Sequence, residues 1–131
     1  MLKIEHIGIA VKNIEEANTL FTVLLGEKNY KTEIVVSEKV NTSFFKIGES
    51  KIELLQATDS ESPIAKFLEK RGEGVHHIAF AVRNIDAKIK QLQEQGFQFI
   101  ADIPKKGADN KLICFLHPKS TKGILIELCQ E

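Results

Sequence analysis

The alternation of apolar and polar residues predicts a β-strand over residues 4–11. Ile7, Ile9 and Val11 fall on one face of this strand, because successive side chains of a strand point to opposite sides. The other face carries a histidine followed by two small residues (His6, Gly8 and Ala10). We therefore expect one face to pack and the other to display His6 with open space beside it.

A helix is predicted after this strand, because the apolar spacing changes from two to three or four residues. Asn13 is a suitable N-cap, with Glu16 in the position of a capping box, and Gly26 marks the end. The predicted apolar stripe consists of Ala17, Leu20, Phe21 and Leu24. Three strands, at residues 31–37, 41–47 and 51–57, complete a β-α-β-β-β module, with a tight turn at residues 48–50.

The same pattern recurs in the second half of the chain. HIGIAVKNI starts at His6 and HIAFAVRNI at His77, an offset of 77 − 6 = 71 residues, and IELLQ at residues 52–56 is repeated as IELCQ at residues 126–130. The second module is predicted to contain a strand at residues 75–82, a helix from the cap Asn84 to Gly96, and strands at 97–101, 112–116 and 124–129. The chain therefore contains two copies of one module.

A short helix is predicted between the modules. Ser62 is its cap, Pro63 its first residue and Gly72 its stop. Module one then spans about residues 1–57, the linker helix about 60–74 and module two about 75–131. Neither module is long enough to bury a sheet face unaided, so we expect an α+β fold in which the paired modules form a single domain over residues 1–131, with a curved mixed sheet, helices outside and a concave cleft inside.

Composition narrows the choice of partners and compartment. The 18 basic and 18 acidic residues give zero net charge, which argues against nucleic acid or an anionic membrane as an obligatory partner. No apolar run is long enough to span a bilayer. Cys114 and Cys129 lie in apolar runs without metal-ligand spacing, which favours free thiols. We expect a soluble, cytoplasmic protein.

The repeat also carries the candidate chemistry. Strand parity places Glu53 opposite Ile52 and Leu54, and Glu127 opposite Ile126 and Leu128. A carboxylate in the middle of an apolar strand is costly to bury unless it is paired or binds a cation. With one histidine per module, the sequence predicts a cation site formed by two histidines and two carboxylates: His6, Glu53, His77 and Glu127.

Two further histidines lie outside this set. His76 precedes His77, so it should point to the opposite side of the strand and be structural or exposed to solvent. His117, in the loop FLHPKS, could contact a substrate or simply shape the turn.

Three stretches together resemble the methylmalonyl-CoA epimerases of the vicinal oxygen chelate superfamily, which includes glyoxalase I. They are HIGIAVKNI, SPIAKFLEKRGEGVHHIAF and FLHPKSTKGILIELCQ, and the resemblance extends over nearly the whole chain. It implies paired modules around a divalent metal held by His6, Glu53, His77 and Glu127, with Glu53 at a position where some epimerases have Gln. The metal would be cobalt, manganese, zinc, nickel or magnesium, the substrate an acyl-CoA, and the assembly a homodimer.

The reaction that this resemblance implies is interconversion of the epimers of 2-methylmalonyl-CoA through a metal-stabilised enolate. Glu127 would act both as ligand and as acid/base. The second base is less well matched: the Glu of some family members falls near Thr42, and Glu38 is the nearest upstream acid. The segment KKGADNK (residues 105–111) also departs from the family, in which many epimerases read close to GAHGK.

Three other functions remain compatible with these residues. A glyoxalase I-like isomerase acting on a glutathione hemithioacetal would use the same four ligands. A non-enzymatic small-molecule binding protein of the superfamily is disfavoured by the four intact polar ligands. An extradiol dioxygenase is disfavoured because those enzymes use three ligands from one module pair in a longer chain.

Overall fold

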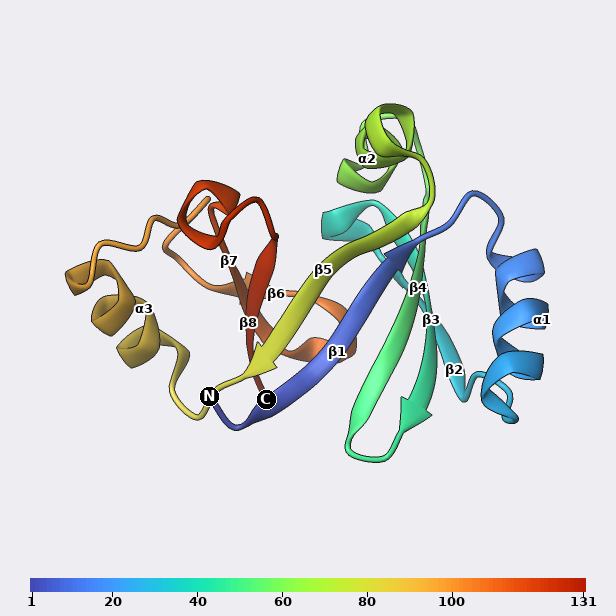
Figure 1. The fold of residues 1–131 in the computed structure, drawn as a ribbon, viewed down its shortest axis with the longest axis horizontal. Helices are drawn as coiled ribbons and strands as arrows, with labels where there is room; N and C mark the ends of the chain where they lie inside the picture. The colour runs from blue at the N-terminus through green and yellow to red at the C-terminus, as the bar shows by residue number, and fades with distance from the viewer. The chain divides into compact units, whose positions relative to one another are not determined.

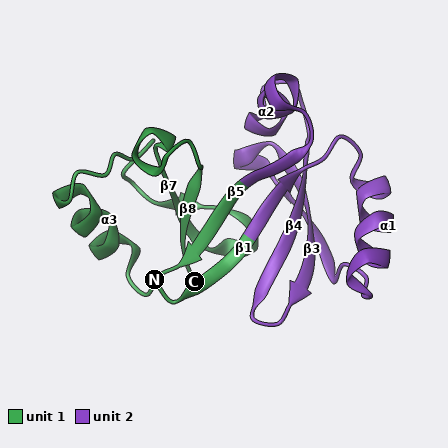
Figure 2. Cartoon of the chain, in the orientation of Figure 1, with its two compact units in different colours: residues 1–6, 77–131 green, residues 7–76 purple.

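The computed structural model describes all residues from Met1 to Glu131 (Figure 1). The chain divides into two compact units, shown in different colours in Figure 2. Unit 1 comprises residues 1–6 and 77–131, and unit 2 comprises residues 7–76. Strands β1 (Lys3–Ala10) and β5 (Gly74–Ala81) each contribute residues to both units.

Unit 2 contains an antiparallel sheet and two helices. Helices α1 (Ile14–Leu25) and α2 (Pro63–Arg71) have the predicted caps: Asn13 accepts a hydrogen bond from the backbone N–H of Glu16, and Ser62 accepts one from that of Ile64. Strand β3 (Val40–Ile47) pairs with both of its neighbours. They are β2 (Lys31–Val35) and β4 (Ser50–Ala57).

The end of β2 differs from the prediction, which extended this strand to residue 37. A 3₁₀ turn, η1 (Val36–Glu38), follows β2 directly. Lys39 then adopts a left-handed backbone conformation and its N–H donates to the carbonyl of Val36. This tight reversal brings β3 back alongside β2, so β2 ends early.

The predicted apolar stripe of α1 is only partly right. Ile14, Ala17, Phe21 and Leu25 pack with Val11, Phe45 and Leu54 to form the core of unit 2. Leu20 and Leu24, which the prediction placed in the stripe, are exposed in the structure. The apolar stripe begins one turn earlier than predicted, at Ile14. Steps of three and four residues from Ile14 lead to Ala17 and Phe21, and they bypass Leu20 and Leu24.

Unit 1 contains helix α3 (Ile85–Glu94) and a mixed sheet. Strand β8 (Ile126–Gln130) pairs in parallel with β5 and antiparallel with β7 (Leu112–Leu116), which pairs in turn with the short β6 (Lys105–Lys106). Two 3₁₀ turns flank β7, η2 (Ala108–Asn110) and η3 (Pro118–Thr121). The mixed pairing confirms the expected α+β class.

The strand predicted at residues 97–101 is wrong. Only an isolated bridge between Phe99 and Leu116 forms there, and β7 pairs instead with β6, where no strand was predicted. Phe97 and Phe99 instead pack against the core of unit 1. The buried members of that core are Val82, Ile85, Ile89, Cys114, Leu116 and Leu128.

The last residue of each repeated IEL-x-Q segment has a structural function. The side-chain oxygen of Gln56 accepts a hydrogen bond of 2.6 Å from the backbone N–H of Ile14, and that of Gln130 accepts one of 2.6 Å from Ile85. Ile14 and Ile85 are the first residues of α1 and α3, where backbone N–H groups have no partner within the helix. The repeat therefore fastens the same strand end to the same helix start in each unit.

Both cysteines are buried, and neither is in a disulfide. Burial, with a smaller contribution from Asp102, raises the pKa of the Cys114 thiol to about 11. No helix combines the length and the apolar character needed to cross a bilayer.

The Gln130 contact should be measurable as stability. We expect Gln130→Ala to lower the free energy of unfolding by about 1–2 kcal/mol, because a helix-start N–H loses its acceptor. Urea unfolding followed by circular dichroism would measure this, with the exposed Gln93→Ala as control. Equal stability of the two variants would contradict the proposed contribution of Gln130.

Candidate functional site

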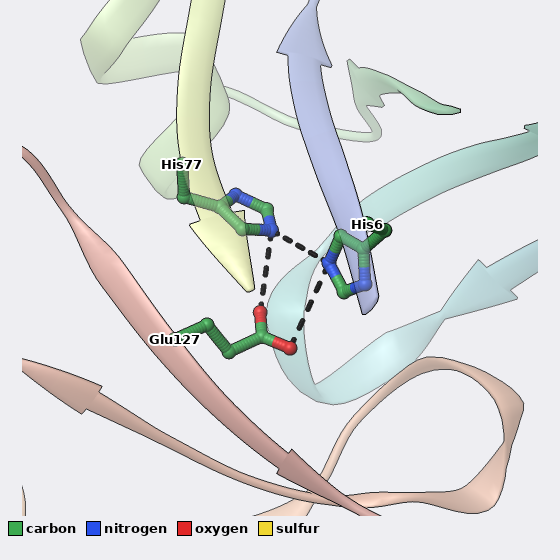
Figure 3. A group of neighbouring side chains, drawn as sticks. All are labelled: His6, His77 and Glu127. Carbon is green, nitrogen blue, oxygen red and sulfur yellow. Dashed lines mark hydrogen bonds and ion pairs between the residues drawn. The ribbon is translucent and has the colours of Figure 1, made fainter. Parts of the chain in front are cut away.

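Three buried polar side chains of unit 1 point toward one another (Figure 3). His6 comes from β1, His77 from β5 and Glu127 from β8, and their exposed fractions are only 4%, 6% and 4%. The two Nε2 atoms lie 2.9 Å apart. Glu127 places one carboxylate oxygen 3.2 Å from Nε2 of His77 and the other 3.7 Å from Nε2 of His6.

These separations suit three ligands of one cation. Ligand atoms held at about 2.1 Å from an ion are about 3.0 Å apart at a right angle and about 3.4 Å apart at the tetrahedral angle. The distance of 2.9 Å between the two Nε2 atoms is close to the first value, and the distances of 3.2 and 3.7 Å, each to a different oxygen of Glu127, lie on either side of the second. The donor set, two imidazole nitrogens and a carboxylate oxygen, is one that zinc and similar divalent metals bind. The residues present therefore fit a divalent cation.

Strand pairing explains how Glu127 is placed beside His77. In the register of β5 and β8, Ala79 is the Cα partner of Glu127, and in that of β7 and β8 the partner is Phe115. Ala79 is fully buried and small, and the ring of Phe115 contacts His77 edge-on, with ring centroids 5.7 Å apart. Glu127 thus lies between Ala79 of β5 and Phe115 of β7, and Phe115 also contacts His77.

The carboxylate of Glu127 is strongly biased toward its ionised form. Burial alone would raise its pKa, but hydrogen bonds and the charges of His6 and His77 outweigh that effect and hold the pKa at about 2, against an ordinary value of 4.5. Glu127 is therefore ionised at neutral pH. An ionised carboxylate buried to this extent needs positive charge beside it, from the imidazoles or from a metal.

The other predicted site residues lie in unit 2. Glu53, in β4, is buried and is the Cα partner of Phe44; its assignment as the fourth ligand stays a prediction. Glu38 ends the 3₁₀ turn η1 and is partly buried, and its assignment as second base also stays a prediction. Thr42, where some epimerases carry a carboxylate, is buried, and its hydroxyl has no hydrogen-bond partner. That position supplies no base in this chain.

The two remaining histidines have separate contacts. The ring of His76 packs edge-on against Phe67 of α2, with centroids 5.0 Å apart, in agreement with a structural assignment. His117 precedes the 3₁₀ turn η3, and its Nδ1 accepts a hydrogen bond from the backbone N–H of Lys119. This hydrogen bond supports the hypothesis that His117 shapes the turn; its contact with a substrate stays a prediction.

Glu5 is a site residue that the sequence interpretation missed. Its carboxylate oxygen Oε1 lies 2.6 Å from Nδ1 of His6, on the far side of the imidazole from the cluster, and Oε2 lies 2.9 Å from Nζ of Lys111. Strand parity concealed this contact, because neighbours in a strand are expected on opposite faces. The only available signal was an acidic residue directly beside the candidate ligand.

Comparisons with known proteins place this geometry in context. The family model described as the glyoxalase/bleomycin resistance protein/dioxygenase superfamily matches residues 5–115. The chain is 40% identical to the uncharacterised protein YqjC of Bacillus subtilis, over 99% of this chain and 93% of that one. It is 37% identical to an ethylmalonyl-CoA/methylmalonyl-CoA epimerase of Cereibacter sphaeroides, over 98% and 97% of the two chains.

Solved structures agree with the sequence relatives. A variant of Streptomyces coelicolor methylmalonyl-CoA epimerase, in complex with 2-nitronate-propionyl-CoA, superimposes with a TM-score of 0.95 at 34% identity, covering 100% of this chain and 95% of that one. The fold class predicted from the two modules is therefore confirmed.

The lowered pKa of Glu127 predicts a pH dependence of stability. Because the folded-state pKa is about 2 and the ordinary value is 4.5, the ionised carboxylate stabilises the folded protein above about pH 4.5, and this contribution is lost as the pH falls toward 2. Urea unfolding of metal-free protein across this range should show a steeper loss of stability in the wild type than in Glu127→Gln.

The exposed Glu94→Gln, which removes the same charge from the surface of α3, is the matched control. It should follow the wild-type curve. Parallel curves for the wild type and Glu127→Gln would contradict a depressed pKa at Glu127.

Proposed function

Because this chain belongs to the glyoxalase/bleomycin resistance protein/dioxygenase superfamily and is an epimerase-type enzyme, we propose that it interconverts the epimers of 2-methylmalonyl-CoA with a divalent metal ion. The observation that carries the proposal is the convergence of three ligand atoms, from His6, His77 and Glu127, all within 4.8 Å of one another and all buried. The similarity to epimerases supplies the substrate class.

The metal would be held by His6, His77 and Glu127, with Glu53 proposed as the fourth ligand. A divalent cation acts as a Lewis acid on a carbonyl or carboxylate oxygen, which favours loss of the neighbouring proton. Imidazole and carboxylate ligands bind many divalent metals, so we propose cobalt, manganese, zinc, nickel or magnesium as the ion.

Epimerisation also requires proton acceptors on both faces of the reacting carbon. Glu127 is proposed for one face, since it is ionised at neutral pH, as a proton acceptor must be, and lies beside the small residue Ala79. Glu38 is proposed for the other face, as the nearest acid upstream of Thr42 in the sequence. In this scheme one residue, as a carboxylate, removes the C2 proton from one face, and the other, as a carboxylic acid, donates a proton to the opposite face; the reverse reaction exchanges these two roles.

The substrate and assembly are proposed from the relatives. The Streptomyces coelicolor enzyme binds 2-nitronate-propionyl-CoA, which supports an acyl-CoA substrate here. Lys119 and Lys122 are exposed on and after η3, where they can meet the phosphates of coenzyme A. We further propose a cytoplasmic homodimer.

A proton-exchange experiment tests the reaction. In deuterated buffer, methylmalonyl-CoA should gain deuterium at C2 in the presence of the metal-loaded protein, because the C2 proton is exchanged with solvent at the active site. Mass spectrometry and proton NMR would measure the incorporation. If C2 stays protonated while the hemithioacetal of glutathione and methylglyoxal is isomerised, the protein is a glyoxalase I-like enzyme instead.

Two adjacent histidines allow a matched test of the site. We expect His77→Ala to lower the exchange rate by about 100- to 1000-fold or more, as is typical when one stabilising contact to a developing charge is lost. His76→Ala removes an equivalent side chain that packs on Phe67, and it should keep near-wild-type activity and metal content. Wild-type turnover and wild-type cobalt content in His77→Ala would show that the metal assignment is wrong.

A further inference from the structure

We infer that Glu5 is a positioning residue for His6, and that Lys111 holds Glu5 in place. Glu5 would fix the tautomer of His6 so that its Nε2 lone pair points into the cluster with His77 and Glu127. This inference deepens the proposed function, because it rests on His6 acting as a metal ligand.

The contacts form a chain within unit 1. The side chain of Glu5 is buried, with a relative exposure of 4%, and its two carboxylate oxygens serve different partners. Oε1 is 2.6 Å from Nδ1 of His6, a distance typical of strong charge-assisted hydrogen bonds. Oε2 is 2.9 Å from Nζ of Lys111, whose side chain is itself only 12% exposed.

The chemistry of these contacts determines where the imidazole proton lies. An ionised carboxylate can only accept hydrogen bonds, so Nδ1 of His6 must donate to Glu5. In its neutral form His6 carries one ring proton, and when Nδ1 holds that proton, Nε2 keeps a lone pair that can accept the hydrogen bond from His77 or bind a metal. Nε2 is the atom that faces His77, at 2.9 Å, and Glu127, at 3.7 Å. A lone pair in that position is what a metal ligand requires.

The same hydrogen bond fixes the orientation of the ring. Histidines that bind metals commonly donate their other ring N–H to a carboxylate or a carbonyl, and removing that acceptor typically weakens metal binding about 10- to 100-fold. Glu5 occupies this acceptor position for His6. The carboxylate also adds negative charge near a site that would receive a cation.

The positive charge of Lys111 stabilises the buried carboxylate of Glu5. An ionised carboxylate with little access to water is costly unless an opposite charge is near, and Nζ of Lys111 lies against it. The same Nζ is 3.7 Å from a carboxylate oxygen of Glu131, which is exposed. Lys111 therefore joins a buried acid to a surface acid.

The loop before β7 explains how Lys111 reaches Glu5. Asp109 and Asn110 both have left-handed backbone conformations, with φ of 64° and 59°, and the N–H of Gly107 donates to the carbonyl of Lys111 at 2.9 Å. A Cβ at Gly107 would lie 2.6 Å from Cδ1 of Ile113, so a side chain there would require Ile113 to shift. The segment that departs from the family sequence is thus a closed turn that presents Lys111.

The tautomer can be measured without metal. In metal-free protein labelled with ¹⁵N-histidine, at about pH 8 where ordinary imidazoles are neutral, long-range ¹H–¹⁵N NMR distinguishes protonated Nδ1 from protonated Nε2. We expect His6 of the wild type to carry its proton on Nδ1. In Glu5→Ala this preference should be lost, whereas Glu5→Gln, whose side-chain carbonyl can still accept, should keep it.

Cobalt titration followed by calorimetry gives the second measurement. Glu5→Ala should bind Co²⁺ about 10- to 100-fold more weakly than the wild type. Glu5→Gln should bind more weakly than the wild type but more tightly than Glu5→Ala, and Lys111→Met should show a smaller loss in the same direction. Glu131→Gln is the matched control, since it removes a carboxylate that meets Lys111 but no histidine, and it should bind Co²⁺ like the wild type.

The outcomes separate this inference from the proposed function. Failure of the wild type to bind Co²⁺, with the Nδ1–H tautomer present, would overturn the metal site and leave the Glu5–His6 contact established. Wild-type cobalt affinity in Glu5→Ala, or a His6 proton on Nε2 in the wild type, would overturn the inference itself. If Glu5→Ala does not fold, the variants Glu5→Gln and Lys111→Met test the inference instead. Wild-type affinity for Co²⁺ in both variants would reject the role of Glu5.

Discussion

The candidate site depends on one electrostatic constraint, the burial of Glu127 in ionised form between two imidazoles. Glu127, His6 and His77 are nearly inaccessible to solvent, so water cannot satisfy their polar atoms. The carboxylate lowers its energy through the imidazoles, and its pKa falls to about 2 in spite of burial. A divalent cation at the same point would satisfy all three groups together, which is why the arrangement suits a metal better than a purely structural cluster.

The surrounding architecture serves to hold these groups at fixed separations. Glu127 lies between β5 and β7, where Ala79 and Phe115 are its Cα partners, and the next residues of β8 reach the start of α3 through Gln130. Within five residues, this repeated strand thus carries a candidate ligand and holds the start of a helix. The corresponding Gln56 does the same for α1, so duplication preserved the scaffold contact as well as the polar residues.

Much of the local structure could be predicted because it depends on neighbours in sequence. Asn13, Ser62 and Asn84 cap helices where their residue types and spacing indicated, since a cap needs only the next two or three residues. The errors came from contacts between distant segments. The packed face of α1 and the missing strand at residues 97–101 depend on which side chains the sheet can accommodate, which local periodicity does not specify.

The sequence alone determined the duplication, the alternation within each strand and hence which polar residues could share a face. The meeting of His6 and His77 was foreseeable because they hold equivalent positions in the two copies, and strand parity marked Glu127 as a polar residue that could join them. Only the tertiary structure decided the distances among their ligand atoms and the contacts of Glu5 with His6 and Lys111. Those depend on strand register, on a left-handed turn and on side-chain rotamers, none of which is encoded by the spacing of residues along the chain.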